Sequence, residues 1–250
     1  MTEPLLTVEN LEVAYGRGSR ALHGVSLTVP ARSCVGLVGL NGAGKTTTLR
    51  AISGFSRFER ATVTGGRIRC DGVDITGWQP HQTSAAGISL VAERDKVFLS
   101  LTVEENLQIA VRRRRGTPEE DVVRRMLDQF PVLAPLRKKQ AGYLSGGERQ
   151  FLATAAALAS DPKLLLVDEA TLGLSPLAGD AVLDKFRELK EQRELTVLLV
   201  DQNVQAVLDV CEYSYVIANG VIVARGTSEE LEREGAVEEL GFGLTRRPVS

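Results

Sequence analysis

Residues 39–46, with the sequence GLNGAGKT, match the phosphate-loop pattern G-x-x-x-x-G-K-[ST]. In such a loop the glycines let backbone N–H groups surround phosphate oxygens, and the following helix adds a partial positive charge. Lys45 would reach the β- and γ-phosphates, and Thr46 would place its hydroxyl on Mg²⁺. The alternative is a glycine-rich turn with an exposed lysine, which an apolar strand before the loop and a helical stretch after it disfavour. The candidate contacts are Gly39, Asn41, Gly42, Ala43, Gly44, Lys45, Thr46 and Thr47.

Two acidic residues, Asp168 and Glu169, follow the unbroken apolar run at residues 164–167. Such a run is typical of a buried parallel strand, and the side chains after it emerge at the sheet edge where α/β proteins bind ligands. Two solvated acids are the alternative interpretation. Together with a phosphate loop, the pair favours nucleotide hydrolysis, with Asp168 on Mg²⁺ and Glu169 polarising the water that attacks the γ-phosphate.

A third motif, LSGGERQ at residues 144–150, precedes a helical run at 151–160. Ser145 and Glu148 satisfy the S-x-x-E capping box, so a plain helix start would account for them. However, the motif lies between the phosphate loop and the acidic pair, after a helical stretch. In this order the three motifs resemble those of the ATP-binding cassette (ABC) ATPases, and the resemblance covers about residues 5–240.

The resemblance implies that the ATP site is shared between two subunits. In the family, the signature helix points at the γ-phosphate held by a second cassette, so two cassettes enclose two ATP molecules. Ser145 and Gly147 are then expected to contact the partner's ATP, and ATP and Mg²⁺ are the expected cofactors. Tyr15 matches the aromatic residue that stacks on adenine, although it would also simply end a strand.

Several family positions carry unusual residues here. Glu93 stands where most cassettes have a glutamine that links the γ-phosphate and Mg²⁺ to the permease, and Gln202 stands where most have a histidine. A glutamine amide donates to a γ-phosphate oxygen but cannot hold a proton, so we expect slow hydrolysis in this chain's own site. Ala170 replaces the usual proline, and residues 171–176 lack the usual aspartate, which puts communication between the two sites in question. Lys45, Glu169 and Gln202 are the expected catalytic residues; Thr46, Asp168 and Glu93 are the expected metal-binding residues.

With these departures, the sequence resembles one subfamily, the LivF-type ATPases of branched-chain amino acid importers. The resemblance rests on the acid in residues 91–94, Phe98, residues 101–107 (LTVEENL), residues 173–176 and the pair at 202–203. It implies two transmembrane permease subunits, a different partner cassette that has the usual histidine, and, indirectly, a solute-binding protein. A homodimer in isolation stays open. Urea and short-amide importers use a similar subunit and are the alternative.

Two other functional classes fit the sequence less well. Soluble cassettes in DNA repair or translation usually carry a coiled coil, a zinc insertion or a second cassette, none of which is present. A catalytically dead regulatory cassette is disfavoured by the intact Lys45, Thr46, Asp168 and Glu169. The basic run at residues 112–115 is typical of a solvated helix end, with lipid head-group contact as the other interpretation.

The hydrophobic pattern predicts the elements that would hold these residues. Alternating stretches at 5–15 and 22–29 predict antiparallel strands, and 34–38 predicts a strand leading into a helix from about residue 44. Further strands are expected at 65–71, 88–92, 164–167 and 196–200, with a helix at 177–192 and a hairpin at 213–223 that turns at Asn219-Gly220. The expected fold is an α/β P-loop NTPase of the ABC ATPase type, with a RecA-like parallel sheet and an N-terminal antiparallel β subdomain. A helical subdomain at about 96–160 is inserted into the ATP-binding domain at 5–240, and 241–250 form a loosely held tail.

The composition is that of a folded globular chain. The 250 residues are 43% hydrophobic and 25% charged, with a formal net charge of −2, so no nucleic-acid partner is expected. No apolar run approaches the ~20 residues that span a bilayer, and we expect no secretory signal from the first residues, MTEP, which offer no basic region followed by an apolar core. We expect a cytoplasmic protein, peripheral on the inner face of the cell membrane. The spacings of Cys34, Cys70 and Cys211 support neither a zinc site nor a disulfide framework and predict buried cysteines, and His23 and His81 match no metal-ligand pattern.

Overall fold

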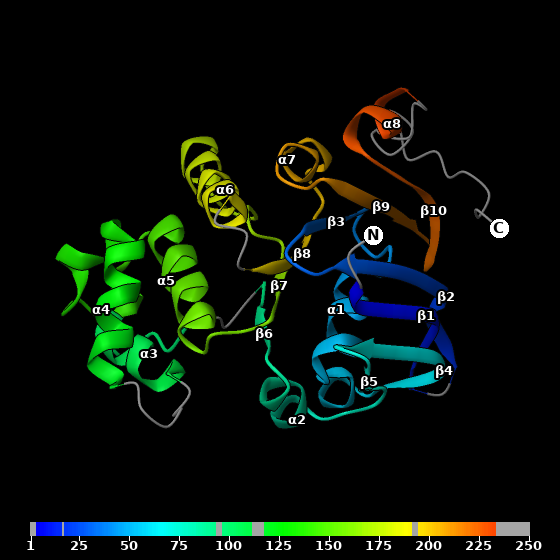
Figure 1. Cartoon of the computed structure of the whole chain (residues 1–250), viewed down its shortest axis with the longest axis horizontal. Coiled ribbons are helices and arrows are strands. Elements are labelled where there is room, and N and C mark those ends of the chain that lie inside the picture. Colours follow the sequence, from blue (N-terminus) through cyan, green and yellow to red (C-terminus); the bar gives the residue numbers. More distant parts are fainter. Residues whose placement is uncertain (1–3, 17, 94–96, 112–117, 192–194, 234–250) are drawn as a thin grey trace.

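A computed structural model describes residues 4–16, 18–93, 97–111, 118–191 and 195–233, and the functional elements lie around a six-stranded sheet (Figure 1). The strand order is β10-β9-β3-β8-β7-β6, and only β10 runs antiparallel to its neighbour. The strands are β3 (Cys34–Val38), β6 (Ile88–Val91), β7 (Leu164–Asp168), β8 (Thr196–Asp201), β9 (Tyr213–Ala218) and β10 (Val221–Gly226). The predicted parallel sheet and the predicted hairpin at Asn219-Gly220 are therefore confirmed.

A second sheet has four antiparallel strands in the order β2-β1-β4-β5. Its strands are β1 (Pro4–Tyr15), β2 (Ser19–Pro30), β4 (Ala61–Cys70) and β5 (Val73–Asp74). The alternation expected for β1 and β2 is confirmed by buried Leu6, Val8, Leu11 and Val13, which line one side of β1. This sheet is the expected N-terminal antiparallel part of an ABC ATPase fold.

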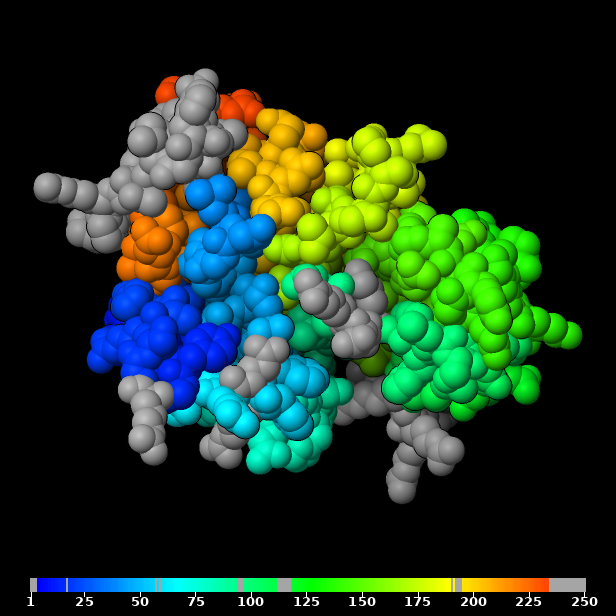
Figure 2. Space-filling model, turned by 180° about the vertical axis from the view of Figure 1, so that it is seen from behind, coloured from blue at the N-terminus to red at the C-terminus, as the bar shows by residue number. Residues whose placement is uncertain are grey.

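Eight α-helices lie within the described residues: α1 (Lys45–Ser53), α2 (Pro80–Ala85), α3 (Val103–Ala110), α4 (Glu119–Gln129), α5 (Gly146–Ala159), α6 (Pro176–Glu191), α7 (Val204–Leu208) and α8 (Ser228–Arg233). Helices α3, α4 and α5 pack on one another as a lobe at one side of the molecule, with β1 and β2 at the other side (Figure 2). The bounds expected for the helical subdomain stay a prediction. The basic run at 112–115 and the tail at 241–250 lie outside the described residues.

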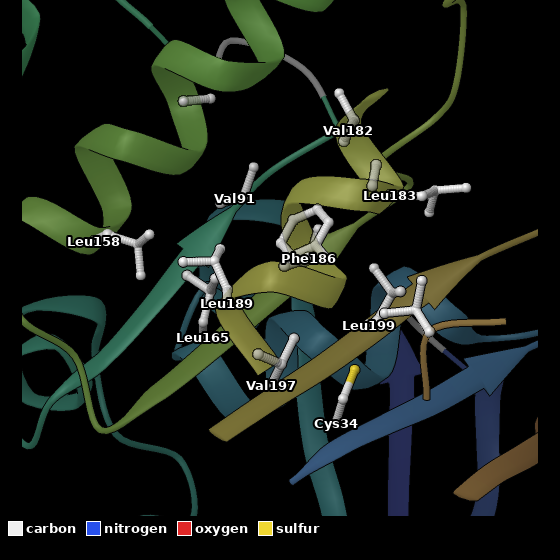
Figure 3. Packing of buried hydrophobic residues seen from close by; sticks show 14 of the residues in the cluster. Cys34, Val91, Leu158, Leu165, Val182, Leu183, Phe186, Leu189, Val197 and Leu199 are labelled. Carbon is white, nitrogen blue, oxygen red and sulfur yellow. The ribbon is translucent and has the colours of Figure 1, made fainter. Parts of the chain in front are cut away.

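The six-stranded sheet is covered on both faces, which explains why its central strands are apolar throughout. On one face, Phe186 and Leu189 of α6 point toward Leu165 of β7 and Val197 of β8 (Figure 3). On the other face, α1 and the four-stranded sheet pack against alternate strand residues, such as Leu166. Because β3, β7 and β8 are fixed on both sides, the loops at their carboxyl ends start from a rigid base.

Cys34, Cys70 and Cys211 are buried, as predicted. The Sγ atoms of Cys34 and Cys211 lie 3.0 Å apart between the start of β3 and the end of α7. Burial raises the pKa of the Cys70 thiol to about 11, which keeps it protonated and unreactive near neutral pH. In the described part of the chain, we find no helix with the length and apolarity needed to cross a bilayer.

Candidate nucleotide site

The loop between β3 and α1 depends on glycines at positions where a larger residue would be strained or would clash. Gly44 precedes α1 with φ of +112°, a conformation that L side chains rarely adopt. A Cβ atom on Gly39 would lie 2.3 Å from the carbonyl oxygen of Ile217 in β9. The loop is therefore packed against the sheet at one end and turned directly into a helix at the other, as a phosphate loop requires.

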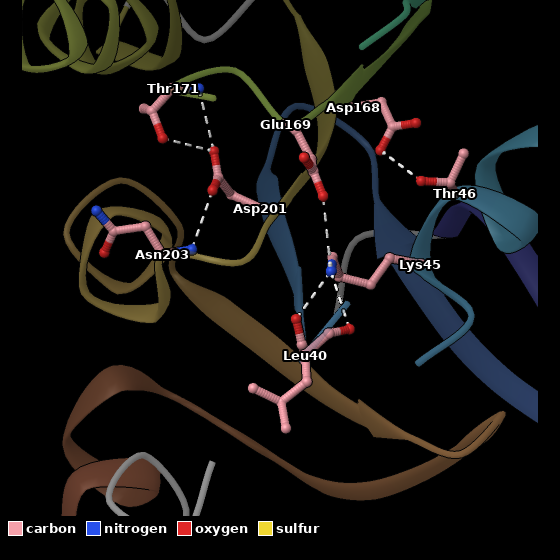
Figure 4. Close-up of polar contacts among 9 residues, drawn as sticks. Leu40, Lys45, Thr46, Asp168, Glu169, Thr171, Asp201 and Asn203 are labelled. Atoms are coloured by element: carbon pink, nitrogen blue, oxygen red, sulfur yellow. Dashed lines mark hydrogen bonds and ion pairs between the residues drawn. The ribbon is translucent and has the colours of Figure 1, made fainter. Parts of the chain in front are cut away.

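Lys45, the first residue of α1, lies under this loop with a side chain that is almost fully buried. Its Nζ donates to the carbonyl oxygens of Gly39 at 2.8 Å and Leu40 at 3.2 Å (Figure 4). The same Nζ lies 3.8 Å from Oε1 of Glu169. Burial lowers the pKa of Lys45, while the carboxylates of Glu169 and Asp168 oppose this shift. The buried cation is thus held among acceptors that a phosphate group would replace.

Asp168 and Thr46 form a pair of hard oxygen ligands. Oγ1 of Thr46 donates to Oδ1 of Asp168 at 3.2 Å, across the gap between α1 and the end of β7 (Figure 4). Burial raises the pKa of Asp168 to about 6, the Thr46 hydroxyl lowers it, and the neighbouring carboxylate of Glu169 raises it further. A hydroxyl and a carboxylate suit Mg²⁺, which normally completes its shell with phosphate oxygens and waters. Consistently, among the residues that the structure describes, no three His, Cys, Asp or Glu are grouped as a protein-only metal site.

Glu169 is held in a strained conformation at the end of β7. Its φ of +49° is unusual for a residue other than glycine, and its N–H donates to the carbonyl oxygen of Val200 in β8 at 2.7 Å. Such strain persists only where the surroundings impose it, and it is concentrated at functional sites. Here it turns the chain sharply, so that the Glu169 carboxylate lies beside Lys45 (Figure 4).

Tyr15, at the end of β1, lies next to the same helix. Its hydroxyl is 3.0 Å from Oγ1 of Thr47 in α1, and its side chain is half-buried. The predicted adenine contact is therefore adjacent to the phosphate loop. Its role as a stacking residue stays a prediction.

The structure does not bring Ser145 and Gly147 to the phosphate loop. Ser145 caps α5: its N–H donates to Oε2 of Glu148 at 2.6 Å, and its Oγ accepts from the Glu148 N–H at 3.3 Å. A Cβ on Gly147 would lie 3.2 Å from Cβ of Ala178 in α6, and the main neighbours of α5 are α3, α4, α6 and β6. In the fold, the signature residues therefore belong to the lobe of α3, α4 and α5, whereas the phosphate loop lies between β3 and α1.

Glu93 lies near both the acidic pair and the start of α5, whereas Gln202 follows β8. Glu93 lines a hollow of about 890 Å³ together with Asp168, and a second hollow of about 240 Å³ together with Gly146 and Gly173. Gln202 is exposed directly after β8. Both positions follow the carboxyl ends of strands in the parallel sheet, the edge where ligands bind in α/β proteins.

Two residues that the sequence did not single out, Asp201 and Thr171, are also part of the site. Oδ2 of Asp201 accepts from the backbone N–H of Thr171 at 3.2 Å and from its Oγ1 at 3.0 Å, and Oδ1 of Asp201 accepts from the N–H of Asn203 at 3.0 Å (Figure 4). Asp201 ends an apolar strand in the same way as Asp168, and that parallel was the available signal. The contact with Thr171 crosses from one loop to another, so sequence spacing does not reveal it.

Comparisons with known proteins agree with this geometry. Residues 22–172 match the family model for ABC transporters. The chain is 37% identical to a probable branched-chain amino acid transport ATP-binding protein, LivF, of Archaeoglobus fulgidus, over 93% of this chain and 98% of that protein. It is 35% identical to the lipopolysaccharide export ATP-binding protein LptB of Haemophilus influenzae, over 96% and 97% of the two chains.

A solved structure of similar fold completes the comparison. The ADP conformation of MJ1267, an ATP-binding cassette of an ABC transporter, matches with a TM-score of 0.83 and 28% identity, covering 97% of this chain and 100% of that one. The family match and the full-length relatives agree with the order of the phosphate loop, the signature motif and the acidic pair. The chain therefore belongs to the ABC transporter family, as one of its ATP-hydrolysing cassettes.

Proposed function

We propose that this chain powers an importer of branched-chain amino acids, bound to two permease subunits at the inner face of the cell membrane. The observation that carries the proposal is the full-length similarity to the LivF protein of Archaeoglobus fulgidus. Glu93 and Gln202, which stand where most cassettes have a glutamine and a histidine, also support it, because both are among the residues that resemble the LivF-type ATPases. A second, different cassette would supply the signature helix that completes this chain's ATP site.

Each residue at the site would have a distinct task. Lys45 would exchange the carbonyl oxygens of Gly39 and Leu40 for oxygens of the β- and γ-phosphates. Thr46 and Asp168 would hold Mg²⁺, which when bound neutralises charge on the phosphates. Deprotonated Asp168 is the form suited to that role, so binding is expected to weaken as the pH falls through about 6.

Hydrolysis would depend on Glu169 and Gln202. Glu169 would accept a hydrogen bond from the attacking water and orient it toward the γ-phosphate. Gln202 would donate its amide N–H to a γ-phosphate oxygen, and it has no proton to exchange at neutral pH. Glu93, which shares a hollow with Asp168, would link this site to the permease.

A second candidate, lipopolysaccharide export, is favoured by the 35% identity to LptB of Haemophilus influenzae. In that case the cassettes would work with a permease that moves a lipid instead of an amino acid. The two candidates share the ATP chemistry and differ in partner and transport direction.

The test is isolation of the tagged full chain from gently solubilised membranes of its native cell, with mass spectrometry of the proteins that accompany it. We expect two different permeases and a second cassette with a histidine at the position of Gln202. Vesicles containing the isolated complex should then take up radiolabelled leucine, isoleucine or valine on addition of ATP.

The matched control is the same vesicles supplied with a non-hydrolysable ATP analogue, which should occupy both ATP sites but not drive uptake. Uptake of urea or a short amide instead would reassign the solute. Transport of lipopolysaccharide instead of an amino acid would favour export, and recovery of soluble proteins or nucleic acid alone would contradict the transport proposal.

A further inference from the structure

Asp201 joins two loops through a side chain that is 2% exposed. Its Oδ2 accepts both the backbone N–H and the hydroxyl of Thr171, and its Oδ1 accepts the N–H of Asn203 (Figure 4). Buried carboxylates are stable only when such donors satisfy them. Both oxygens of Asp201 are used, each toward a different segment of chain.

The first segment carries Glu169. Thr171 follows it by two residues, in the turn that the positive φ of Glu169 begins. The N–H of Glu169 donates to the carbonyl oxygen of Val200, the residue before Asp201. The backbone of this turn is thus fixed to the end of β8 at two points, one through the main chain and one through the Asp201 side chain.

The second segment carries Gln202. Asn203 begins α7, and its Oδ1 accepts from the Ala206 N–H at 3.2 Å, which caps the helix. The bond from the Asn203 N–H to Oδ1 of Asp201 closes a tight turn in which Gln202 is the middle residue. The backbone of Gln202 is therefore enclosed by the bonds of Asp201 and Asn203, while its side chain stays exposed.

We propose that Asp201 is a positioning residue for hydrolysis, which fixes the turn carrying Glu169 relative to the turn carrying Gln202, so that both act on one γ-phosphate. The proposal rests on the functions proposed above for Glu169 and Gln202. Its physical basis is that a displacement of about 1 Å between reacting groups costs on the order of 100-fold in rate. ATP binding depends mainly on Lys45 and the phosphate loop, so Asp201 should affect turnover more than affinity.

The principal variant is Asp201→Asn, which keeps the size of the side chain. Its amide NH₂ cannot accept a hydrogen bond, so the bonds to either Thr171 or Asn203 are lost. In steady-state hydrolysis by the purified full chain, at concentrations high enough for two copies to pair and complete each other's ATP sites, we expect kcat to fall by roughly 10- to 100-fold, with KM for ATP changed by less than about twofold. Hydrogen exchange of the peptide spanning residues 169–176, measured with MgATP, should rise as well.

A milder pair of variants tests the other end of the contact. Thr171→Val removes only the hydroxyl donor, and we expect kcat to fall by about 3- to 10-fold. Thr171→Ser keeps the hydroxyl and should restore kcat to near the wild-type value. The double variant Asp201→Asn/Thr171→Val should be little worse than Asp201→Asn alone, because both changes break the same contact.

Thr196→Val is the matched control at the opposite end of β8, where Oγ1 of the buried Thr196 accepts from the Arg32 N–H at 2.8 Å. It should lower Tm without changing kcat or exchange at residues 169–176. If Asp201→Asn behaves like Thr196→Val, Asp201 has only a structural role and the inference is wrong. If Glu169→Gln keeps full turnover, the function proposed for Glu169 fails, whatever Asp201→Asn shows.

Discussion

Lys45 and Glu169 face each other at 3.8 Å, yet they are expected to serve different steps. Lys45→Ala removes the cation that would contact the phosphates, and we expect ATP affinity to fall by roughly 10- to 100-fold, the weight of a charge-assisted hydrogen bond. Glu169→Gln keeps the size of the side chain but weakens the group that would orient water. It should leave ATP affinity nearly unchanged and lower kcat by about 10²- to 10⁴-fold.

Nucleotide-binding titrations and single-turnover hydrolysis separate these two effects. Lys185→Ala is a suitable control, because Lys185 forms its ion pair with Glu188 on α6, within the same helix. It should bind and hydrolyse ATP normally. Unchanged turnover in Glu169→Gln would remove Glu169 as the residue that activates water.

Asp168 is expected to lower the stability of the free protein at neutral pH. Its pKa is raised from 3.8 to about 6, chiefly by burial, so its favourable contribution is complete below pH 3.8 and is lost as the pH rises to about 6. Asp168→Asn removes the buried charge and keeps an oxygen that accepts from Thr46. At pH 7.5, without nucleotide, we expect its free energy of unfolding to exceed that of wild type by about 1–3 kcal/mol.

Urea denaturation at several pH values tests this expectation. The advantage of Asp168→Asn should shrink as the pH falls from 6 to 4, since wild-type Asp168 then becomes protonated in the folded state. Addition of MgATP should stabilise wild type and not the variant. An advantage that persists unchanged at pH 4 would mean that the buried charge of Asp168 is not its cause.

At the scale of elements, Ser145 caps α5 and, in the proposed function, would also contact the partner's ATP; one substitution separates the two roles. Aspartate caps helices as well as serine does, so Ser145→Asp should change the free energy of unfolding by less than about 1 kcal/mol. Its negative charge, however, would oppose the γ-phosphate of the partner cassette. We expect normal stability together with loss of ATP-driven association between cassettes, measured by light scattering with Glu169→Gln as the background that retains ATP.

Helix α3 provides the control for this prediction, because Thr102 and Glu105 form the same capping box as Ser145 and Glu148. Thr102→Asp should match Ser145→Asp in stability and associate normally with ATP. Loss of association in both variants would point to the added charge in general and not to contact between Ser145 and a phosphate.

The elements that carry the site were predictable where local signals agreed. The apolar runs before Asp168 and Asp201 indicate buried strands and nothing else. The glycines at 39–44 likewise indicate a phosphate loop. Helix α2 was not predicted, since its six residues bury only Thr83 and show no apolar stripe. The contact between Thr171 and Asp201 was not predictable either, because it depends on the spacing of β7 and β8 in the folded sheet.

At the scale of the whole molecule, the start of α5 lines one hollow together with Glu93, whereas Arg50 of α1 and Asp168 line another hollow together with Glu93. In the part of the chain that the structure describes, α1 packs beside the sheets, whereas α5 belongs to the lobe formed with α3 and α4. In the proposed function, a single chain would contribute one half to each of two different ATP sites. Substitutions in the two halves should therefore affect different ATP molecules in the assembled transporter.

This separation predicts unequal effects in a complex with a different cassette that has the usual histidine. Lys45→Ala disables the site that contains Gln202, which we expect to be slow, so the complex should keep more than about half of its ATP turnover. Ser145→Asp disables the partner's faster site and should remove most of the turnover. The double variant loses both sites and should be inactive, as measured by phosphate release from the isolated complex. Equal losses from the two single variants would show that Gln202 does not slow its own site, and the replacement of the usual histidine would then have no kinetic consequence.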